Sequence, residues 1–326
     1  MIPESILGRI AHSAGIEDRW LVTLDVMSVY LLQHLDEIDM LEHMCFKGGI
    51  SLRKVFARVP SRFSRDVDFV DASYQQVSDQ GLSSEEYYYK LLYAFDGQNI
   101  HDVLWKVKPV EENQLLGDTL RVDLHFFVYD DSPTSGWETR ADNVLSIECS
   151  FRRPILLPTS RRALREESWF KNLEFAPSPV PVLQTEEAIS EKVRAAFQRN
   201  NARDIFDLFQ YGQLVFDEEL VRTMSVMKCW QDRGLYDGPT NFDPHEFLEK
   251  LKVENYEWDR LKLQVSQHSW IDPASLISAL RQRLSFIEHL SELELELCAD
   301  RAQRKSALHD ELWQSCKERH QGIKSG

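Results

Sequence analysis

Cysteines are few in this sequence and they follow no spacing pattern. The five of them are widely separated and none forms a Cys-x-x-Cys pair, so neither a zinc site of that type nor a disulfide framework is predicted. Reduced thiols are typical of the cytoplasm, which is where we expect the protein. The sequence also shows no leader-like basic and apolar segment, and no apolar run near the roughly 20 residues of a membrane span, so we expect no membrane partner.

Basic residues are outnumbered. There are 38 Lys and Arg against 53 Asp and Glu, which gives a net charge of -15. Such an acidic balance argues against broad, non-specific affinity for nucleic acid, although it leaves room for a local basic pocket. Two windows are rich in arginine, and they comprise Arg152, Arg153, Arg161, Arg162 and Arg165, then Arg194, Arg199 and Arg203.

Several common catalytic motifs are absent as well. The sequence contains no GxxxxGK[ST] phosphate loop, no HExxH and no GxSxG. The usual signatures of P-loop nucleotide hydrolases, zinc peptidases and serine hydrolases are therefore missing. Any chemistry has to come from other residues.

Periodicity divides the chain into a mixed part and a helical part. Apolar residues recur at helical spacing between Trp20 and Leu32, and strand-like alternation appears at 103–110, 120–129 and 144–151. We expect an α+β fold with a mixed sheet, flanking helices and a helical domain after it.

Composition changes after Arg153, where prolines become frequent. From Glu186 onward the pattern is almost wholly helical, and we expect a long charged helix from about 274 to 316. The predicted domains are an N-terminal α/β domain at 1–155, a proline-containing connection at 156–185, and a C-terminal helical domain at 186–326.

The first candidate site is Asp66-Val67-Asp68 on a predicted strand. Residues two apart on a strand point to the same face, so the two carboxylates lie side by side. Their mutual repulsion is relieved by a cation, and hard oxygen ligands suit Mg²⁺. A solvated pair of charges on an edge strand is the simpler interpretation of this short motif.

Upstream of this pair lies Gly48-Gly49-Ile50-Ser51, just before a predicted helix. Glycines let a phosphate approach the backbone closely, and free amides at a helix start favour an anion. Ser51 can add a hydroxyl donor. A plain tight turn with a capping serine would give the same pattern.

A third acid on a neighbouring strand would complete a metal site. Glu148 and Asp123 each lie between apolar residues on a predicted strand. Either one can instead be an outward-facing charge on a half-exposed sheet. We favour Glu148 narrowly and keep Asp123 as the alternative.

In the helical part, Lys192 precedes the segment Arg203-Asp204-Ile205-Phe206-Asp207. Asp204 and Asp207 are three residues apart and share one helical face. A lysine can neutralise triphosphate charge as a point cation. A structural ion pair between Lys192 and Asp207 is the alternative.

Taken in order, these segments resemble the AbiEii/AbiGii toxin family of nucleotidyltransferases, within the DNA polymerase beta-like superfamily. The matching strings run from Phe46 to Val55, from Arg62 to Phe69 and from Leu145 to Arg152, and the last match is Glu191-Lys192 followed by Ala202 to Leu208. The sequence departs from the family at Arg65, where an acid is common, and in a slightly longer interval between Gly49 and Asp66.

The resemblance implies a nucleotidyltransferase-like fold and a role for each candidate residue. Asp66, Asp68 and Glu148 would bind Mg²⁺, and the residues expected to hold or contact the nucleotide are Gly48, Gly49, Ser51, Arg62, Ser64, Lys192, Arg203 and Asp204. Lys192 and Asp207 would take part in catalysis. The reaction moves a nucleoside monophosphate from an NTP to an acceptor hydroxyl of tRNA or protein, and the family implies a cognate antitoxin and a role in phage defence.

Two other functions are compatible with the same residues. One is a catalytically silent binding module that docks a partner through its acidic surface and its long C-terminal helix. The other is a small-molecule nucleotidyltransferase, such as one that modifies an antibiotic.

Overall fold

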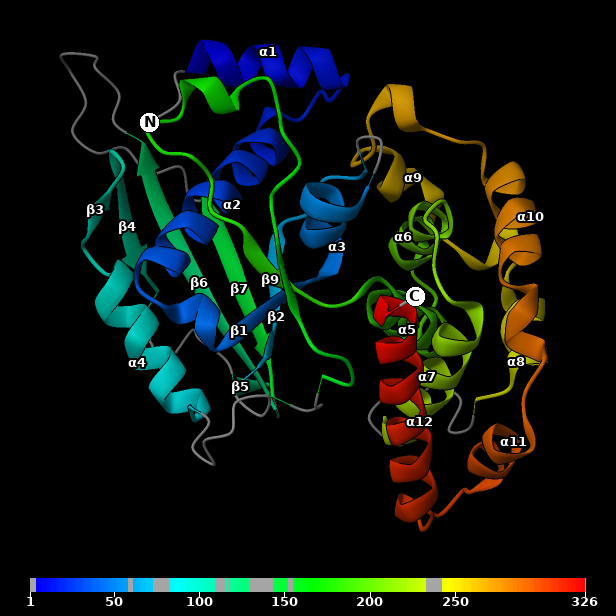
Figure 1. Ribbon diagram of the computed structural model, residues 1–326. Coiled ribbons are helices and arrows are strands. Elements are labelled where there is room, and N and C mark those ends of the chain that lie inside the picture. Colours follow the sequence, from blue (N-terminus) through cyan, green and yellow to red (C-terminus); the bar gives the residue numbers. More distant parts are fainter. Residues whose placement is uncertain are drawn as a thin grey trace, which may run out of the picture. The chain divides into compact units, whose positions relative to one another are not determined.

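The computed structural model describes most of the chain (Figure 1). The described residues are 4–57, 61–72, 82–108, 115–116, 118–128, 143–151, 155–232 and 242–325. Arg152 and Arg153 of the first arginine-rich window lie outside them, as do the last residues of the strands expected at 103–110 and 120–129.

The chain forms two compact units, which are described separately. The first unit comprises Met1–Ile155, Thr159–Val182 and Leu263–Ser269. The second comprises Leu156–Pro158, Leu183–Lys262 and Trp270–Gly326. The three-part division at residues 155 and 185 stays a prediction.

The first unit is built on a nine-stranded mixed sheet with the order β3-β4-β6-β7-β2-β1-β9-β8, and β5 pairs with β6. The strands are β1 Met44–Lys47, β2 Asp66–Asp71, β3 Asn99–Ile100, β4 Val103–Val107, β5 Leu115–Leu116, β6 Thr119–Val128, β7 Val144–Ser150, β8 Ser160–Arg162 and β9 Val180–Val182. Strand β2 is central: it runs antiparallel to β1 and parallel to β7.

One face of this sheet is apolar. Register places Val67 opposite Ile147, and Ile147 opposite Val122, so the three side chains share a face. Helices α2 (Arg19–Glu37) and α4 (Ser84–Phe95) cover this face (Figure 1). Because alternate residues on a strand point to opposite sides, the acids between these apolar residues lie on the other face.

Local sequence signals explain where the helices begin. The Asp18 side chain accepts a hydrogen bond from the Trp20 amide at the start of α2, and Ser83 and Glu86 form a capping box at the start of α4. Helix α1 spans Glu4–Ala14. Between β1 and β2 the chain makes a helical turn, α3 (Gly48–Ser51), that continues as a π-helical turn over Leu52–Phe56.

The second unit is helical, as the sequence predicts. Its helices are α5 Thr185–Gln198, α6 Ala202–Gly212, α7 Glu218–Gln231, α8 Pro244–Lys250, α9 Trp258–Lys262, α10 Pro273–Arg283, α11 Glu292–Ala299 and α12 Ser306–Ser325. Helix α5 packs against both α6 and α7. Among the helices of the described ranges, none is both long and apolar enough to cross a bilayer.

One expectation about the second half of the chain is wrong. The single helix expected from 274 to 316 is three helices, because Ser291 and Glu294 form a capping box that starts α11 and Gln303 takes a left-handed backbone conformation before α12. The proline-containing connection also holds regular structure, since Val180–Val182 joins the sheet beside β1 despite Pro181.

Candidate active site

The polar face of the sheet gathers the acids that the sequence singles out. In register, Asp68 lies opposite Glu148 on β7, and Glu148 lies opposite Arg121 on β6. One step along, Asp66 lies opposite Ser146, and Ser146 lies opposite Asp123. Side chains of directly paired residues share a face, so this set forms a continuous polar patch over three strands.

Asp66 and Asp68 alternate with buried neighbours as the strand pattern predicts. Both are partly exposed, whereas Val67 and Phe69 are fully buried. Burial of the two apolar side chains therefore holds the two carboxylates on one side of β2.

Gly48 is required for the position of Asp68. Its φ is +79°, in the left-handed region, and a Cβ there would lie 1.9 Å from Asp68 Oδ2. The carboxylate thus occupies the space that any side chain at position 48 would need. Lys47 pairs with Asp68 across β1 and β2, and this pairing brings the glycine turn to the acid.

Gly49 leaves space in the same way for the guanidinium group of Arg62. A Cβ on Gly49 would lie 2.5 Å from Arg62 Nη2, so the guanidinium is in direct contact with the backbone. Arg62 and Ser64 are both almost fully buried. Asp68 therefore lies against Gly48, and Arg62 lies against Gly49. Asp68 and Asp66 belong to the same strand, β2.

Ser51 is the residue of the glycine turn expected to add a hydroxyl donor. Its side chain is fully buried, and its Oγ has no hydrogen-bond partner among the described residues. A phosphate contact from Ser51 stays a prediction, one that the buried hydroxyl does not favour.

A buried network of ion pairs anchors the helical turn that follows the two glycines. Asp25 on α2 accepts hydrogen bonds from Arg53 Nε at 2.9 Å and Lys54 Nζ at 2.7 Å, in the π-helical turn. Arg53 also donates to the Ser61 carbonyl at 3.0 Å and lies 3.8 Å from the centre of the Phe63 ring. One side chain thereby connects the turn after Gly49 to the loop that carries Arg62.

Glu148 lies closest in register to the acid pair. Burial, followed by the negative charge of Asp66, raises the pKa of Glu148 above its ordinary value, although Arg121 opposes this. Arg121 Nη1 donates to Glu148 Oε1 at 3.1 Å.

Asp123 is bound by Ser146 and Arg121. Burial opposes its ionisation, but a 2.6 Å hydrogen bond from Ser146 and the charge of Arg121 outweigh burial and lower the pKa of Asp123. Strand β7 separates β6 from β2, so Asp123 is one strand further from Asp66 than Glu148 is. Glu148 is therefore the nearer of the two candidates, and which of them completes a cation site stays a prediction.

The acid pair suits a hard divalent cation. Within the described ranges, no three His, Cys, Asp or Glu side chains converge as a metal-binding group. Mg²⁺, however, is typically bound through one or two protein carboxylates plus phosphates and water. Asp66 and Asp68 supply that number on one partly exposed face.

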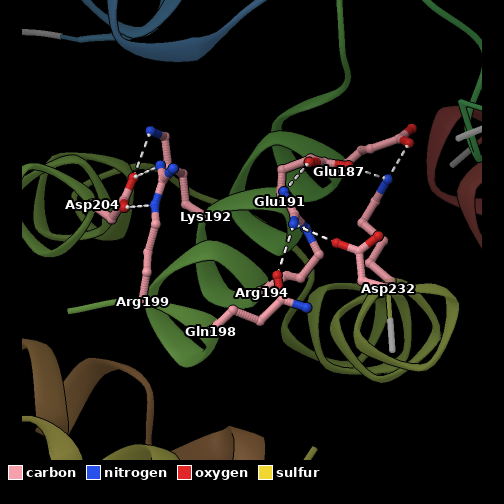
Figure 2. A network of polar contacts seen from close by, with 9 residues as sticks. Glu187, Glu191, Lys192, Arg194, Gln198, Arg199, Asp204 and Asp232 are labelled. Atoms are coloured by element: carbon pink, nitrogen blue, oxygen red, sulfur yellow. Dashed lines mark hydrogen bonds and ion pairs between the residues drawn. The ribbon is translucent and has the colours of Figure 1, made fainter. Parts of the chain in front are cut away.

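In the second unit, Lys192 and the two acids of α6 form a buried cluster. Lys192 Nζ lies 2.7 Å from Asp207 Oδ2 and 3.2 Å from Asp204 Oδ1. Arg199 holds Asp204 with two hydrogen bonds, of 2.7 and 3.1 Å (Figure 2). Asp204 and Asp207 do share one helical face, and Lys192 is ion-paired to both.

A second network fixes α5 to α7. Lys228 is fully buried between Glu187 at 2.9 Å and Glu191 at 2.8 Å, and Arg194 pairs with Asp232 (Figure 2). Arg194 therefore has a structural partner within this unit. Arg203 is partly exposed, with its Nε 3.5 Å from Asn201 Oδ1.

Sequence inspection missed two members of the polar patch, Arg121 and Ser146. A signal was present for Arg121: it is two residues from Asp123 on a predicted strand, so both point to one face. The same signal was present for Ser146, which is two residues from Glu148 on a predicted strand, but its bonds to Asp123 and Arg121 depend on the pairing of β6 with β7.

Comparison with known proteins gives a family and a fold. The family model described as nucleotidyl transferase AbiEii toxin, type IV TA system, matches residues 30–321. No curated protein matches the chain. Among solved structures, the nucleotidyltransferase toxin MenT4 from Mycobacterium tuberculosis H37Rv aligns with a TM-score of 0.75 and 23% identity, over 97% of this chain and 100% of its own.

A second solved structure is more distant. An antigenic nucleotidyltransferase-like protein from Paracoccidioides brasiliensis aligns with 14% identity over 60% of this chain and 77% of its own. Its TM-score of 0.35 is too low to inform the fold. The mixed sheet with flanking helices and a following helical part is the architecture shared with the MenT4 structure.

Proposed function

Because the chain belongs to the AbiEii family of nucleotidyl transferase toxins of type IV toxin–antitoxin systems, we propose that it transfers a nucleoside monophosphate from an NTP to an acceptor hydroxyl with Mg²⁺ as cofactor. The observation that carries this proposal is the acid pair. Asp66 and Asp68 share one face of β2, and the Asp68 carboxylate lies against the Gly48 backbone.

In this proposal Asp66 and Asp68 hold the cation, with Glu148 as the third acid. The bound cation supplies charge neutralisation at the attacking and leaving oxygens. The acceptor oxygen forms a bond to the α-phosphorus, the bond from that phosphorus to the bridging oxygen breaks, and pyrophosphate leaves. The acceptor proton passes to a neighbouring carboxylate or to water.

The glycine turn and Arg62 would bind the phosphates. Gly48 and Gly49 carry no side chains, Gly48 is partly exposed, and the Arg62 guanidinium lies directly against the buried Gly49. Such a site works mainly by positioning and by fixed charge. Ser64, two residues from Asp66, is a predicted further contact.

Lys192 and Arg203 are proposed contacts to the nucleotide or the acceptor. The ion pairs of Lys192 with Asp204 and Asp207 support a fixed ammonium position, since both acids are almost fully buried. Asp204 and Asp207 would then orient this lysine. A plain structural ion pair accounts for the same distances, so function has to be measured.

We propose tRNA or protein as the acceptor, a cognate antitoxin as partner, and the cytoplasm as the site of action. The family supports an antitoxin and an NTP. The alternative binding module would dock through its acidic surface and through a C-terminal segment that is three helices and not one.

The test is transfer of label from each NTP, with Mg²⁺, to total RNA and to total protein. We expect the natural chain to label one of the two fractions and Asp66→Asn to label neither. Asp102→Asn is the matched control, because Asp102 is exposed on the β3–β4 turn and its left-handed φ of +59° suits asparagine.

Equal labelling by Asp66→Asn and the natural chain would refute the proposal. Label found in neither fraction but in a small-molecule extract would support the small-molecule enzyme instead. No label anywhere, with no nucleotide bound, would leave a silent binding module.

A further inference from the structure

Arg121 lies among the acids and contacts three side chains of the polar patch. Its Nε donates to Asp123 Oδ1 at 3.1 Å, its Nη1 to Glu148 Oε1 at 3.1 Å, and its Nη2 to Ser146 Oγ at 3.0 Å. These bonds use all three nitrogens of the guanidinium. Ser146 in turn donates to Asp123 at 2.6 Å, which closes the network.

This arrangement places a fixed positive charge beside the proposed cation site. Arg121 pairs in register with Glu148, and Glu148 pairs with Asp68, so Glu148 lies between the guanidinium and the acid pair. The oxygen that Arg121 binds belongs to the residue proposed as third metal ligand.

We propose that Arg121 is a positioning residue that competes with the divalent cation for Glu148 and so makes tight cation binding depend on the nucleotide. This inference rests on the proposed function, because it needs a cation at Asp66 and Asp68. It adds a role that the motifs of this chain do not assign to position 121.

The physical reason is charge. A guanidinium cannot lose its proton at neutral pH, so it repels a dication at a neighbouring carboxylate under all ordinary conditions. A triphosphate brings several negative charges and its own oxygen ligands. With these present, the added negative charge offsets the repulsion, so the cation can bind beside Glu148 while Arg121 keeps its bonds to Asp123 and Ser146.

Removing the charge should therefore tighten binding of the free ion. Mn²⁺ without nucleotide, followed by electron paramagnetic resonance and calorimetry, is the probe. We expect Arg121→Gln to bind Mn²⁺ at least about tenfold more tightly than the natural chain, the effect of one unit charge near a dication even at high dielectric. Arg121→Lys keeps the charge and should bind Mn²⁺ like the natural chain.

Arg161→Gln is a closely matched control. The Arg161 side chain is 40% exposed and pairs with Asp36 and Glu42, and the Arg121 side chain is 39% exposed and pairs with two acids. Both changes remove one charge and two ion pairs, but only Arg121→Gln removes them from the polar patch. Arg161→Gln should leave the affinity for Mn²⁺ unchanged.

A second measurement needs no variant. In the natural chain, a mixture of the four α,β-methylene NTPs should increase Mn²⁺ affinity at least about tenfold, and Mn²⁺ should increase their affinity by the same factor. If Arg121→Gln binds Mn²⁺ no better than the natural chain, or if nucleotide and Mn²⁺ bind independently, the inference is wrong.

Asp66→Asn separates the two levels of the proposal. Mn²⁺ and nucleotide binding that survive this change would overturn the proposed function itself. If Asp66→Asn abolishes Mn²⁺ binding while Arg121→Gln fails to tighten it, only the role of Arg121 is overturned.

Discussion

Replacing Gly48 by alanine should disable the site at a moderate cost in folding stability. The new Cβ would lie 1.9 Å from Asp68 Oδ2, 2.7 Å from its Cγ and 2.8 Å from its Cβ. Real atoms do not approach so closely. Rotation of the Asp68 side chain can clear its Oδ2 and Cγ, but the contact with its Cβ also requires the backbone at position 48 or in β2 to shift. We therefore expect Gly48→Ala to lose divalent-cation binding and nucleotide transfer by about 100-fold or more, as expected when catalytic geometry shifts by about 1 Å.

The cost in stability can be separated by a matched control. Gly97 has a similar φ of +71°, but a Cβ there would meet nothing within 4 Å. Gly97→Ala thus reports backbone strain alone, about 1–2 kcal/mol. Gly48→Ala should cost about the same plus the displacement of one partly exposed carboxylate, roughly 1–3 kcal/mol in total.

The assays are urea unfolding followed by circular dichroism, and label transfer under identical conditions. We expect both variants to fold, with transfer lost only in Gly48→Ala. A Gly48→Ala protein that transfers nucleotide as well as Gly97→Ala does would show that the contact between position 48 and Asp68 is irrelevant to the chemistry.

Three further changes test the buried charges. Asp25→Asn should cost about 3–5 kcal/mol in urea unfolding, because it removes the carboxylate that Arg53 and the fully buried Lys54 share and leaves only Glu167 paired with Lys54. Burial opposes ionisation of Glu167, but the positive charges of Lys54 and Arg53, with hydrogen bonds from Lys54 and Trp169, together outweigh burial and lower the pKa of Glu167 to about 2, from 4.5. Ionised Glu167 therefore contributes on the order of 3 kcal/mol to the free energy of unfolding above about pH 4.5, and this contribution is lost as pH falls toward 2. Glu167→Gln should remove this dependence of stability on acid. Lys192→Met should cost about 2 kcal/mol by removing the 2.7 Å ion pair with the fully buried Asp207, and it should also lower transfer.

An exposed ion pair provides the control for these three predictions, and each prediction has a result that would contradict it. Lys252→Met removes an exposed 3.8 Å pair with Glu249 and should change stability by less than about 0.5 kcal/mol. A loss below about 1 kcal/mol for Asp25→Asn, or an unchanged acid unfolding profile for Glu167→Gln, would contradict the buried network. Transfer that is unaffected by Lys192→Met would leave Lys192 with a structural role alone.

Strand alternation was readable because one face of the sheet is buried against helices. In β6, Val122 and Leu124 point inward and Arg121 and Asp123 outward, which is a period of two that sequence alone displays. The short strand Val180–Val182 was missed because three residues around a proline show no period. Its place beside β1 is decided by tertiary pairing.

The site was partly readable for the same reason. Asp66 and Asp68 are neighbours in sequence, so their common face follows from strand geometry. Arg121 reaches Glu148 through the register between β6 and β7, and no local pattern encodes register across 27 residues. The long C-terminal helix was an error of another kind, since a helical period alone does not reveal the Ser291 cap that restarts the chain as α11.

The most direct test of the central claim compares two labelled forms of the same NTP. Incubated with Mg²⁺ and the acceptor fraction, the natural chain should transfer label from the α-phosphate and release label from the γ-phosphate as pyrophosphate, and Asp66→Asn and Asp68→Asn should do neither. Transfer of γ-label to the acceptor, or α-transfer that survives the loss of both acids, would contradict a nucleotidyl transfer centred on this pair.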